Sequence, residues 1–231
     1  MRLMPQLALM LAGSLFAASA HADIALGQVV PLTGAQAASG HAYAAGARAF
    51  IDKVNAEGGV AGHKILHVVR DNHGRADESV AQAAALIGQD HVYGILPGAG
   101  SPGSLEMVAS GLLRQKQVPL LTLRNAAARD GGPLANGEDG ISREAGLIEI
   151  TPPVAGYAEI VNEYRAALAQ YGHGEQYSSA GLSGYIGAKV MVGAVRLLVP
   201  AKPTHADYFA ALRNLVPDVA NRMVLSAELA H

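Results

Sequence analysis

The sequence predicts an α/β fold built on a parallel, doubly wound sheet. Short apolar runs alternate with helical patterns between residues 23 and 124, in the order β-α-β-α-β-α-β. Turn residues separate these segments, and the connections are short. Short βαβ units give parallel strands with helices on both faces of the sheet. Ligands of such sheets bind outside the carboxyl ends of the strands.

The composition is that of a globular protein. Half of the 231 residues are hydrophobic, 16% are charged, and the formal net charge is −2. A near-neutral chain gives no support for nucleic-acid binding, which requires a clustered basic face. The absence of cysteine excludes thiol catalysis, Cys-ligated zinc and iron–sulfur clusters. We expect neither a cofactor nor a metal.

Residues 1–22 predict a secretory signal peptide. Arg2 provides a positive start, and the apolar run from Leu7 to Ala18 is too short to span a bilayer. Ala20-His21-Ala22 fits the small-x-small cleavage pattern. The alternative is a buried N-terminal helix. We expect cleavage after Ala22, a periplasmic mature chain, and no membrane span after cleavage.

The first strand and helix show how each element is predicted. Residues 24–30 are an apolar run that Pro31 ends, which indicates a buried strand. Apolar residues recur at helical spacing over 39–56, and Gly58-Gly59 ends that helix. Its predicted buried stripe consists of Tyr43, Ala47, Phe50, Ile51 and Val54. The same reasoning predicts strands over 64–70, 92–96 and 118–123, and helices over 77–89 and 102–116.

The loop between the third strand and its helix is a candidate anion site. Ser101 before Pro102 is a helix-start signal, with Ser as the N-cap and Pro at the first helical position. A helix N-terminus offers unpaired N–H groups and a partial positive charge, and Gly98 and Gly100 allow a ligand close to the backbone. We predict that this loop binds a carboxylate or a phosphate. A purely structural turn is the alternative.

Two enzyme motifs partly match the same loop. Gly98 to Gly103 fits G-x-G-x-x-G, and Arg124 lies where a 2′-phosphate partner is expected, so a nucleotide-dependent oxidoreductase is an alternative function. The motif follows the third predicted strand instead of the first, which counts against it. Residues 99–103 also resemble a nucleophile elbow without its first glycine, but the N-cap role explains Ser101.

The regular alternation ends after residue 124. Residues 125–145 are rich in Gly, Ala, Asp and Asn, which predicts a linker or an ordered loop. One more strand is compatible with residues 145–151. Three helices are then expected: one from Tyr157, a nearly all-apolar and therefore buried one over 185–198, and a last one that Thr204 caps. The sequence shows no evident sheet for them to cover.

Several segments together resemble the periplasmic substrate-binding proteins of ABC transporters, of the leucine/isoleucine/valine-binding type. The most specific is Asn55 to Gly62, which fits N-x-x-G-G-V-x-G after the first helix. The others are Ile24-Ala25-Leu26-Gly27 through Pro31-Leu32-Thr33-Gly34, Gly46-Ala47-Arg48, Arg70-Asp71-Asn72, Tyr157 to Gln170, and Gly184 to Val190. The N-terminal resemblance covers residues 23–125 almost continuously.

The resemblance implies a type I periplasmic-binding fold and a non-enzymatic receptor. In this family two lobes close on a small ligand, typically an amino acid, and present it to a membrane permease. The first lobe here would be residues 23–124. It would hold a small carboxylate through the loop before the first helix and the loops after the third and fourth strands. The ligand-binding residues are then Ser39, Gly98, Ala99, Gly100, Ser101, Thr122, Arg124, Asn125 and Ala126.

The chain departs from the family's ligand contacts at two of these positions. Gly98 and Ala126 stand where amino-acid binders carry a hydroxyl group. Backbone N–H groups remain available there. Arg124 and Asn125 are alternative polar contacts for an acidic or amide-bearing ligand.

A second departure concerns the second lobe. It should open with several β-α units, and the segment between residues 124 and 146 leaves no room for them. Residues 146–231 are therefore interpreted as a mostly helical remnant of an internally truncated second lobe. Binding is then expected to be weakened or lost, because closure needs two lobes. The helix over 185–198 would be exposed and prone to aggregation, and a remnant that binds nothing is a further alternative.

Overall fold

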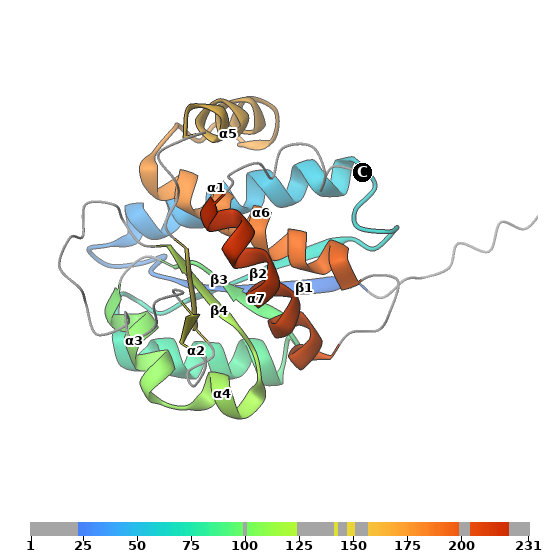
Figure 1. Cartoon of the computed structure of the whole chain (residues 1–231). Helices are drawn as coiled ribbons and strands as arrows, with labels where there is room; N and C mark the ends of the chain where they lie inside the picture. The colour runs from blue at the N-terminus through green and yellow to red at the C-terminus, as the bar shows by residue number, and fades with distance from the viewer. Residues whose placement is uncertain are drawn as a thin grey trace, which may run out of the picture.

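The structure is a computed structural model in which one mixed sheet lies between two layers of helices (Figure 1). It describes residues 23–98, 101–123, 141–142, 147–150, 157–198 and 204–221. The predicted signal peptide lies outside these residues. The strands are β1 (Ile24–Val30), β2 (Ile65–Asp71), β3 (Gly94–Leu96), β4 (Leu120–Leu123), β5 (Ile141–Ser142) and β6 (Leu147–Ile150). The helices are α1 (Ala37–Ala56), α2 (Ala76–Gly88), α3 (Ser101–Ala109), α4 (Leu112–Lys116), α5 (Tyr157–Tyr171), α6 (Ser179–Leu198) and α7 (His205–Asn221).

The six strands follow the order β2-β1-β3-β4-β6-β5. All neighbouring pairs are parallel except β5 with β6. This confirms the predicted α/β class and the strand expected over 145–151. Most of the segment predicted as a linker or loop, 125–145, lies outside the described residues, but residues 141–142 depart from that prediction. They form β5, which is too short to give a periodic sequence signal.

Each face of the sheet has its own apolar core. Every residue of β1 is buried, and alternate side chains point to opposite faces. Ala25 and Val29 belong to the core under α2, α3 and α4. Leu26 belongs to the other core, with residues of α1, α5, α6 and α7. Helix α5 is the outermost element there and covers α1 and α6 (Figure 1).

The placement of α6 corrects the expectation of an exposed apolar helix. This helix packs along α1 and reaches β3 and β4, and thirteen of its residues are buried. It is the one helix of the described chain long and apolar enough to cross a membrane, and 72% of that stretch is buried inside the protein. The helix therefore has a sheet and a neighbouring helix to cover. Whether residues 146–231 derive from a second lobe stays a prediction.

Two of the predicted helices differ from their predicted bounds by more than about two residues. The helix expected over 102–116 is interrupted between α3 and α4, because Gly111 is left-handed with φ of 71° and Ser110 Oγ bonds the Met107 carbonyl. Helix α3 includes Ser101 instead of beginning after it as an N-cap residue. Helix α6 begins at Ser179, six residues before the predicted start.

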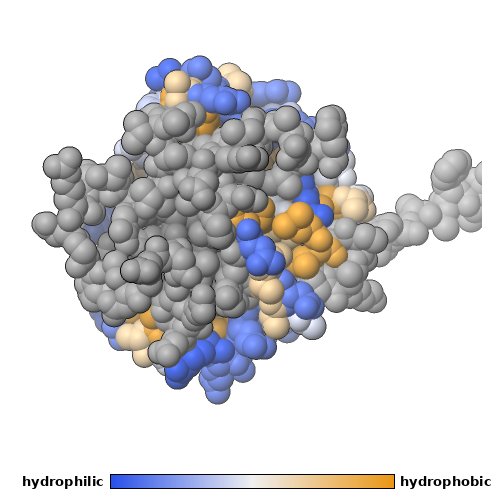
Figure 2. All heavy atoms as spheres, viewed as in Figure 1, coloured by the Kyte–Doolittle hydropathy of each residue, from blue (hydrophilic) through white to orange (hydrophobic). Residues whose placement is uncertain are grey.

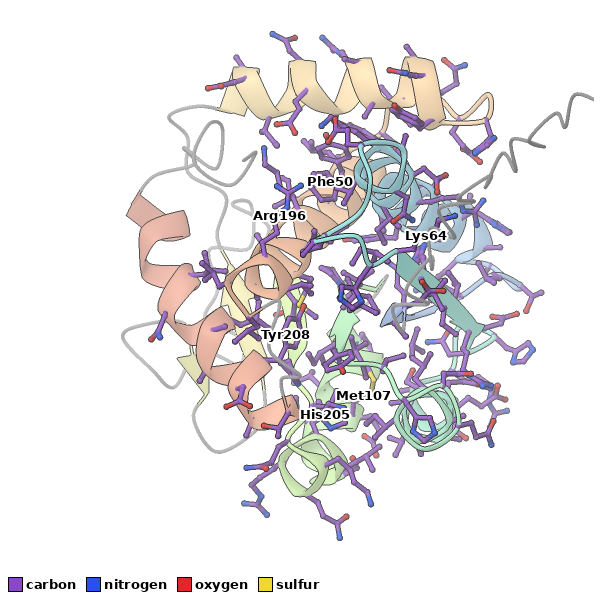
Figure 3. All side chains as sticks on the ribbon, turned by 90° about the vertical axis from the view of Figure 1, so that its right-hand side faces the viewer. Phe50, Lys64, Met107, Arg196, His205 and Tyr208 are labelled. Carbon is purple, nitrogen blue, oxygen red and sulfur yellow. The ribbon has the colours of Figure 1, made fainter. Side chains whose placement is uncertain are left out.

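The last helix carries the predicted cap and a buried aromatic anchor. Thr204 Oγ1 accepts the backbone N–H of Asp207 at 3.2 Å, and Asp207 Oδ2 accepts the backbone N–H of Thr204 at 2.8 Å. This reciprocal pair is a capping box. Tyr208 lies one residue further on, and Figure 3 shows it between α7 and the rest of the domain. Its ring is fully buried.

Large apolar side chains are exposed at few places among the described residues. These exposed side chains are Leu66, Tyr177 and Leu197. On the face drawn in Figure 2, the orange residues form small patches between blue ones. The described part of the chain therefore hides most of its apolar material in the two cores.

Candidate functional site

Asp71 ties two loops together at the carboxyl edge of the sheet. Its Oδ1 accepts the backbone N–H groups of Leu32 at 2.8 Å and His73 at 2.7 Å, and its Oδ2 accepts the Thr33 hydroxyl at 2.8 Å. Partial desolvation raises the pKa of Asp71, but the hydrogen bonds from these donors together lower it by more. The pKa of Asp71 therefore lies below its usual value. The hydrogen bond to Glu78, followed by the charge of Asp71, raises the pKa of His73. The loop after β1 is therefore anchored to the end of β2.

A second contact holds the residue after β2 to α2, next to the first turn of α3. Asn72 Nδ2 donates to Ser79 Oγ at 2.8 Å, and both residues are buried. A Cβ at position 103 would lie 2.6 Å from that Ser79 oxygen. Packing between α2 and α3 thus accounts for Gly103, the last glycine of the G-x-G-x-x-G match.

Three neighbouring groups contact the chain segment after β3 and hold it in place. Gln28 Nε2 donates to the Pro97 carbonyl at 2.5 Å. On α6, a Cβ at position 187 would lie 2.4 Å from the Pro97 ring. At position 98 a Cβ would lie 2.2 Å from the Val29 carbonyl oxygen of β1. The close approach of β1 therefore requires glycine at position 98, whether or not Gly98 contacts a ligand.

Thr122 places a hydroxyl near the end of β4. Its side chain shares a face with Leu120, which lies in the core under α2, α3 and α4. The Oγ1 atom is buried and has no hydrogen-bond partner within the described chain. A buried hydroxyl without a partner is costly. Thr122 therefore has hydrogen-bonding capacity to offer at this edge.

The structure describes four of the nine predicted site residues. Ser39 is exposed in the first turn of α1, and Gly98 is partly buried and follows Pro97, the first residue after β3. Ser101 begins α3, and Thr122 lies on β4, the strand next to β3. Parallel strands bring the loop after β3 and the end of β4 to one edge. Ala99, Gly100, Arg124, Asn125 and Ala126 lie outside the described residues.

Reasoning from the sequence missed Gln28 and His67. Gln28 is fully buried on β1, and its Oε1 lies 2.9 Å from His67 Nε2 on β2. The signal was available, since Gln28 is the single side-chain amide in an apolar run. Burial, followed by the charge of Arg48, lowers the pKa of His67 to about 3. His67 is therefore neutral in the folded protein at ordinary pH.

We expect His67 to make the protein less stable in mild acid. Below pH 6.5 the unfolded chain takes up a proton at this residue that the folded chain refuses until about pH 3. The free energy of unfolding therefore decreases as the pH is lowered through that window, and the loss reaches about 2 kcal/mol at pH 5. Urea unfolding at pH 7 and pH 5 measures this loss. His67→Gln, which keeps a donor for Gln28, should remove it, and exposed His41→Gln should not; an equal loss in all three proteins contradicts the assignment.

The described residues hold no group of three or more His, Cys, Asp or Glu side chains placed to bind a metal ion. The fold is an open α/β sheet of the doubly wound class, a class of fold in which ligands bind outside the carboxyl ends of the strands.

Comparison with known proteins gives the family. A family model described as periplasmic binding protein matches residues 23–142, more than half of the 231 residues. The chain belongs to the periplasmic binding protein family. It is similar to the Leu/Ile/Val-binding protein BraC3 of Rhizobium johnstonii, with 33% identity over 109 residues, which are 46% of this chain and 30% of that protein. Leu/Ile/Val-binding protein homolog 3 of Brucella melitensis is 36% identical over 73 residues, 32% of this chain and 20% of that protein. The matches thus span less than a third of these relatives.

Solved structures show the same fold. A substrate-binding periplasmic protein from Ralstonia solanacearum matches with a TM-score of 0.64 and 18% identity, over 82% of this chain and 88% of that one. The substrate-binding protein LivJ from Streptococcus pneumoniae, in complex with isoleucine, matches with a TM-score of 0.57 and 17% identity, over 82% and 87%. A solute-binding protein from Rhodopseudomonas palustris, in complex with 3,4-dihydroxybenzoic acid, gives 0.56 and 17%, over 82% and 84%.

Proposed function

We propose that the chain is the periplasmic solute-binding component of an ABC transporter and binds a small carboxylate, such as an amino acid. The ligand lies at the carboxyl edge of the sheet, and a membrane permease receives it. The chain performs no catalysis, and the signal peptide is cleaved after Ala22. The ligand-binding set is the predicted one: Ser39, Gly98, Ala99, Gly100, Ser101, Thr122, Arg124, Asn125 and Ala126.

The observation that carries this proposal is the unpartnered hydroxyl of Thr122 on β4, the strand next to the one that α3 follows. The hydroxyl is buried at the strand next to β3, and α3 begins at Ser101. A helix start favours an anion through its free N–H groups and its dipole. A carboxylate oxygen accepts hydrogen bonds from both kinds of donor. One carboxylate would therefore satisfy both features.

The solved neighbours support a carboxylate as the common element of the ligand. Isoleucine is bound to the protein from S. pneumoniae, and 3,4-dihydroxybenzoic acid is bound to the one from R. palustris. The two molecules differ in shape and polarity but share one carboxylate. We therefore propose the class of ligand, a small carboxylate, and no single molecule within it.

Calorimetric titration of the purified chain tests the proposal. We expect L-isoleucine or 3,4-dihydroxybenzoate to bind, and their counterparts without a carboxylate, 2-methylbutylamine and catechol, to fail. Thr122→Val removes the hydroxyl at nearly constant volume and should weaken binding about tenfold or less. Ser183→Ala, which removes a hydroxyl from α6, is the matched control. Failure of a panel of amino acids and aromatic acids to bind the folded chain, or equal binding of catechol, contradicts the proposal.

A further inference from the structure

Gln28 is a fully buried amide in the middle of an inner strand. The other side chains of β1 are apolar, and every residue of the strand is buried. An amide in such a position is costly unless its donors and acceptor are paired. The two partners of Gln28 therefore explain why a polar side chain is tolerated there.

The two partners fix the amide in one orientation. The Pro97 carbonyl can only accept, so the NH₂ group of Gln28 must face it. The Gln28 oxygen then faces His67 and accepts from its Nε2–H at 2.9 Å. A neutral imidazole with its proton on Nε2 leaves Nδ1 bare, and Nδ1 is buried without a hydrogen-bond partner in the described chain. His67 thus donates to Gln28, and Gln28 donates to Pro97.

The bond to Pro97 also sets the direction of the next N–H group. The Pro97 carbonyl and the Gly98 N–H belong to one planar peptide unit and point in opposite directions. Holding the carbonyl toward Gln28 therefore directs the Gly98 N–H away from Gln28. The Pro97 ring against Gly187 and the close approach of Gly98 to Val29 limit sliding of this unit. The hydrogen bond from the Gln28 amide then sets the rotation of the Pro97–Gly98 peptide unit about the chain axis.

We propose that Gln28 is a positioning residue that orients the Gly98 N–H toward the carboxylate of the ligand, and that His67 fixes the amide of Gln28. The proposal rests on the proposed function for its ligand, but the position of the Gly98 N–H is a property of the free protein. Gln28 itself does not touch the ligand. Its effect passes through the Pro97–Gly98 peptide.

Substitution of Gln28 combined with an NMR signal from Gly98 tests this. In the ligand-free, ¹⁵N-labelled chain, Gln28→Met should move the Gly98 amide resonance. Leu26→Met, two positions earlier on the same face of β1, should leave it in place. Gln28→Met should also weaken binding of L-isoleucine or 3,4-dihydroxybenzoate about tenfold. Should Gln28→Met fail to fold, His67→Met releases the amide of Gln28 and is expected to shift the same resonance by a smaller amount.

The outcomes separate this proposal from the proposed function. An unmoved Gly98 resonance in a folded Gln28→Met protein overturns the positioning role. A moved resonance with unchanged affinity overturns the link to the ligand. Failure of the wild-type chain to bind any carboxylate refutes the proposed function, and the ligand-orienting role of Gln28 with it. The Gly98 resonance of the free protein still shows whether Gln28 holds the loop.

Discussion

Replacing Tyr208 by alanine is expected to lower the free energy of unfolding by about 3–5 kcal/mol. The ring is fully buried between α7, α6 and β3, and it meets Tyr93 edge-on with centroids 6.1 Å apart. Its hydroxyl donates to the Met191 carbonyl at 2.6 Å. Truncation leaves a cavity of aromatic size and removes the anchor of the last helix. Urea unfolding or calorimetry measures the loss, and a fall of about 10 °C in Tm is expected for a domain of this size.

Two further variants show which part of Tyr208 matters. Tyr208→Phe keeps the ring and loses only the hydrogen bond to Met191, so about 1 kcal/mol is expected. Tyr177→Ala removes a tyrosine that is 40% exposed and should cost less than Tyr208→Ala. If Tyr208→Ala were as mild as Tyr177→Ala, α7 would not be packed on the sheet as described.

The second large effect is expected at the contact between α1 and α6. A Cβ at position 184 would lie 2.0 Å from the Tyr43 carbonyl oxygen, and one at position 46 would lie 1.8 Å from the Gly181 carbonyl oxygen. These neighbours are backbone atoms, which cannot rotate away as a flexible side chain does. Gly184→Ala must therefore push the helices apart, at a cost of about 3 kcal/mol or more.

The same substitution at Gly88 is the matched control. Nothing lies within 4 Å of a Cβ at position 88, which is the last residue of α2. Gly88→Ala should leave stability unchanged or raise it by up to about 1 kcal/mol, because it restricts the unfolded chain. Unfolding free energies of the two variants are compared directly. Equal stability of Gly184→Ala and Gly88→Ala would contradict the close packing of α1 on α6.

The first part of the fold was predictable because its signals are local. β1 matched residues 24–30 as predicted, since Pro31 marks its end. In the helix over 39–56, Ala47, Phe50, Ile51 and Val54 are buried as the stripe predicted. Each βαβ unit closes on itself through short connections. Reading successive segments was therefore enough to place the first four strands along the chain, although not in the sheet.

The position of the C-terminal helices was not predictable in the same way. Helix α6 lies against α1, more than a hundred residues earlier in the chain, and no local pattern reports such a partner. The one available signal was the spacing of Gly181, Gly184 and Gly187, which lines one side of a helix with small residues. Gly184 accommodates the backbone of α1, Gly181 accommodates the Tyr164 hydroxyl of α5, and Gly187 accommodates the Pro97 ring. The apolar character of the helix correctly indicated burial.

The convergence of the loops at one edge of the sheet was predictable, but the side chains that hold these loops in place were not. Carboxyl ends of parallel strands meet at one edge, so the loops after β1, β2, β3 and β4 had to converge there. The side chains that hold these loops come from further back on the strands. Asp71 was noted as part of the Arg70-Asp71-Asn72 segment, and the role of Gln28 depends on the distance between its amide and Pro97. Such pairings follow from the strand order and register of the sheet, which are not evident from the sequence.

The most direct test of a carboxylate site at this edge is an NMR titration of the ¹⁵N-labelled chain with L-isoleucine and with 3,4-dihydroxybenzoate. The amides of Gly98, Ser101 and Gly103 lie at the carboxyl edge, and those of Gly58 and Gly62 lie in the loop that precedes β2, at the opposite edge. The account predicts saturable shifts in the first group and none in the second. Shifts confined to Gly58 and Gly62, or equal shifts in both groups, would contradict it.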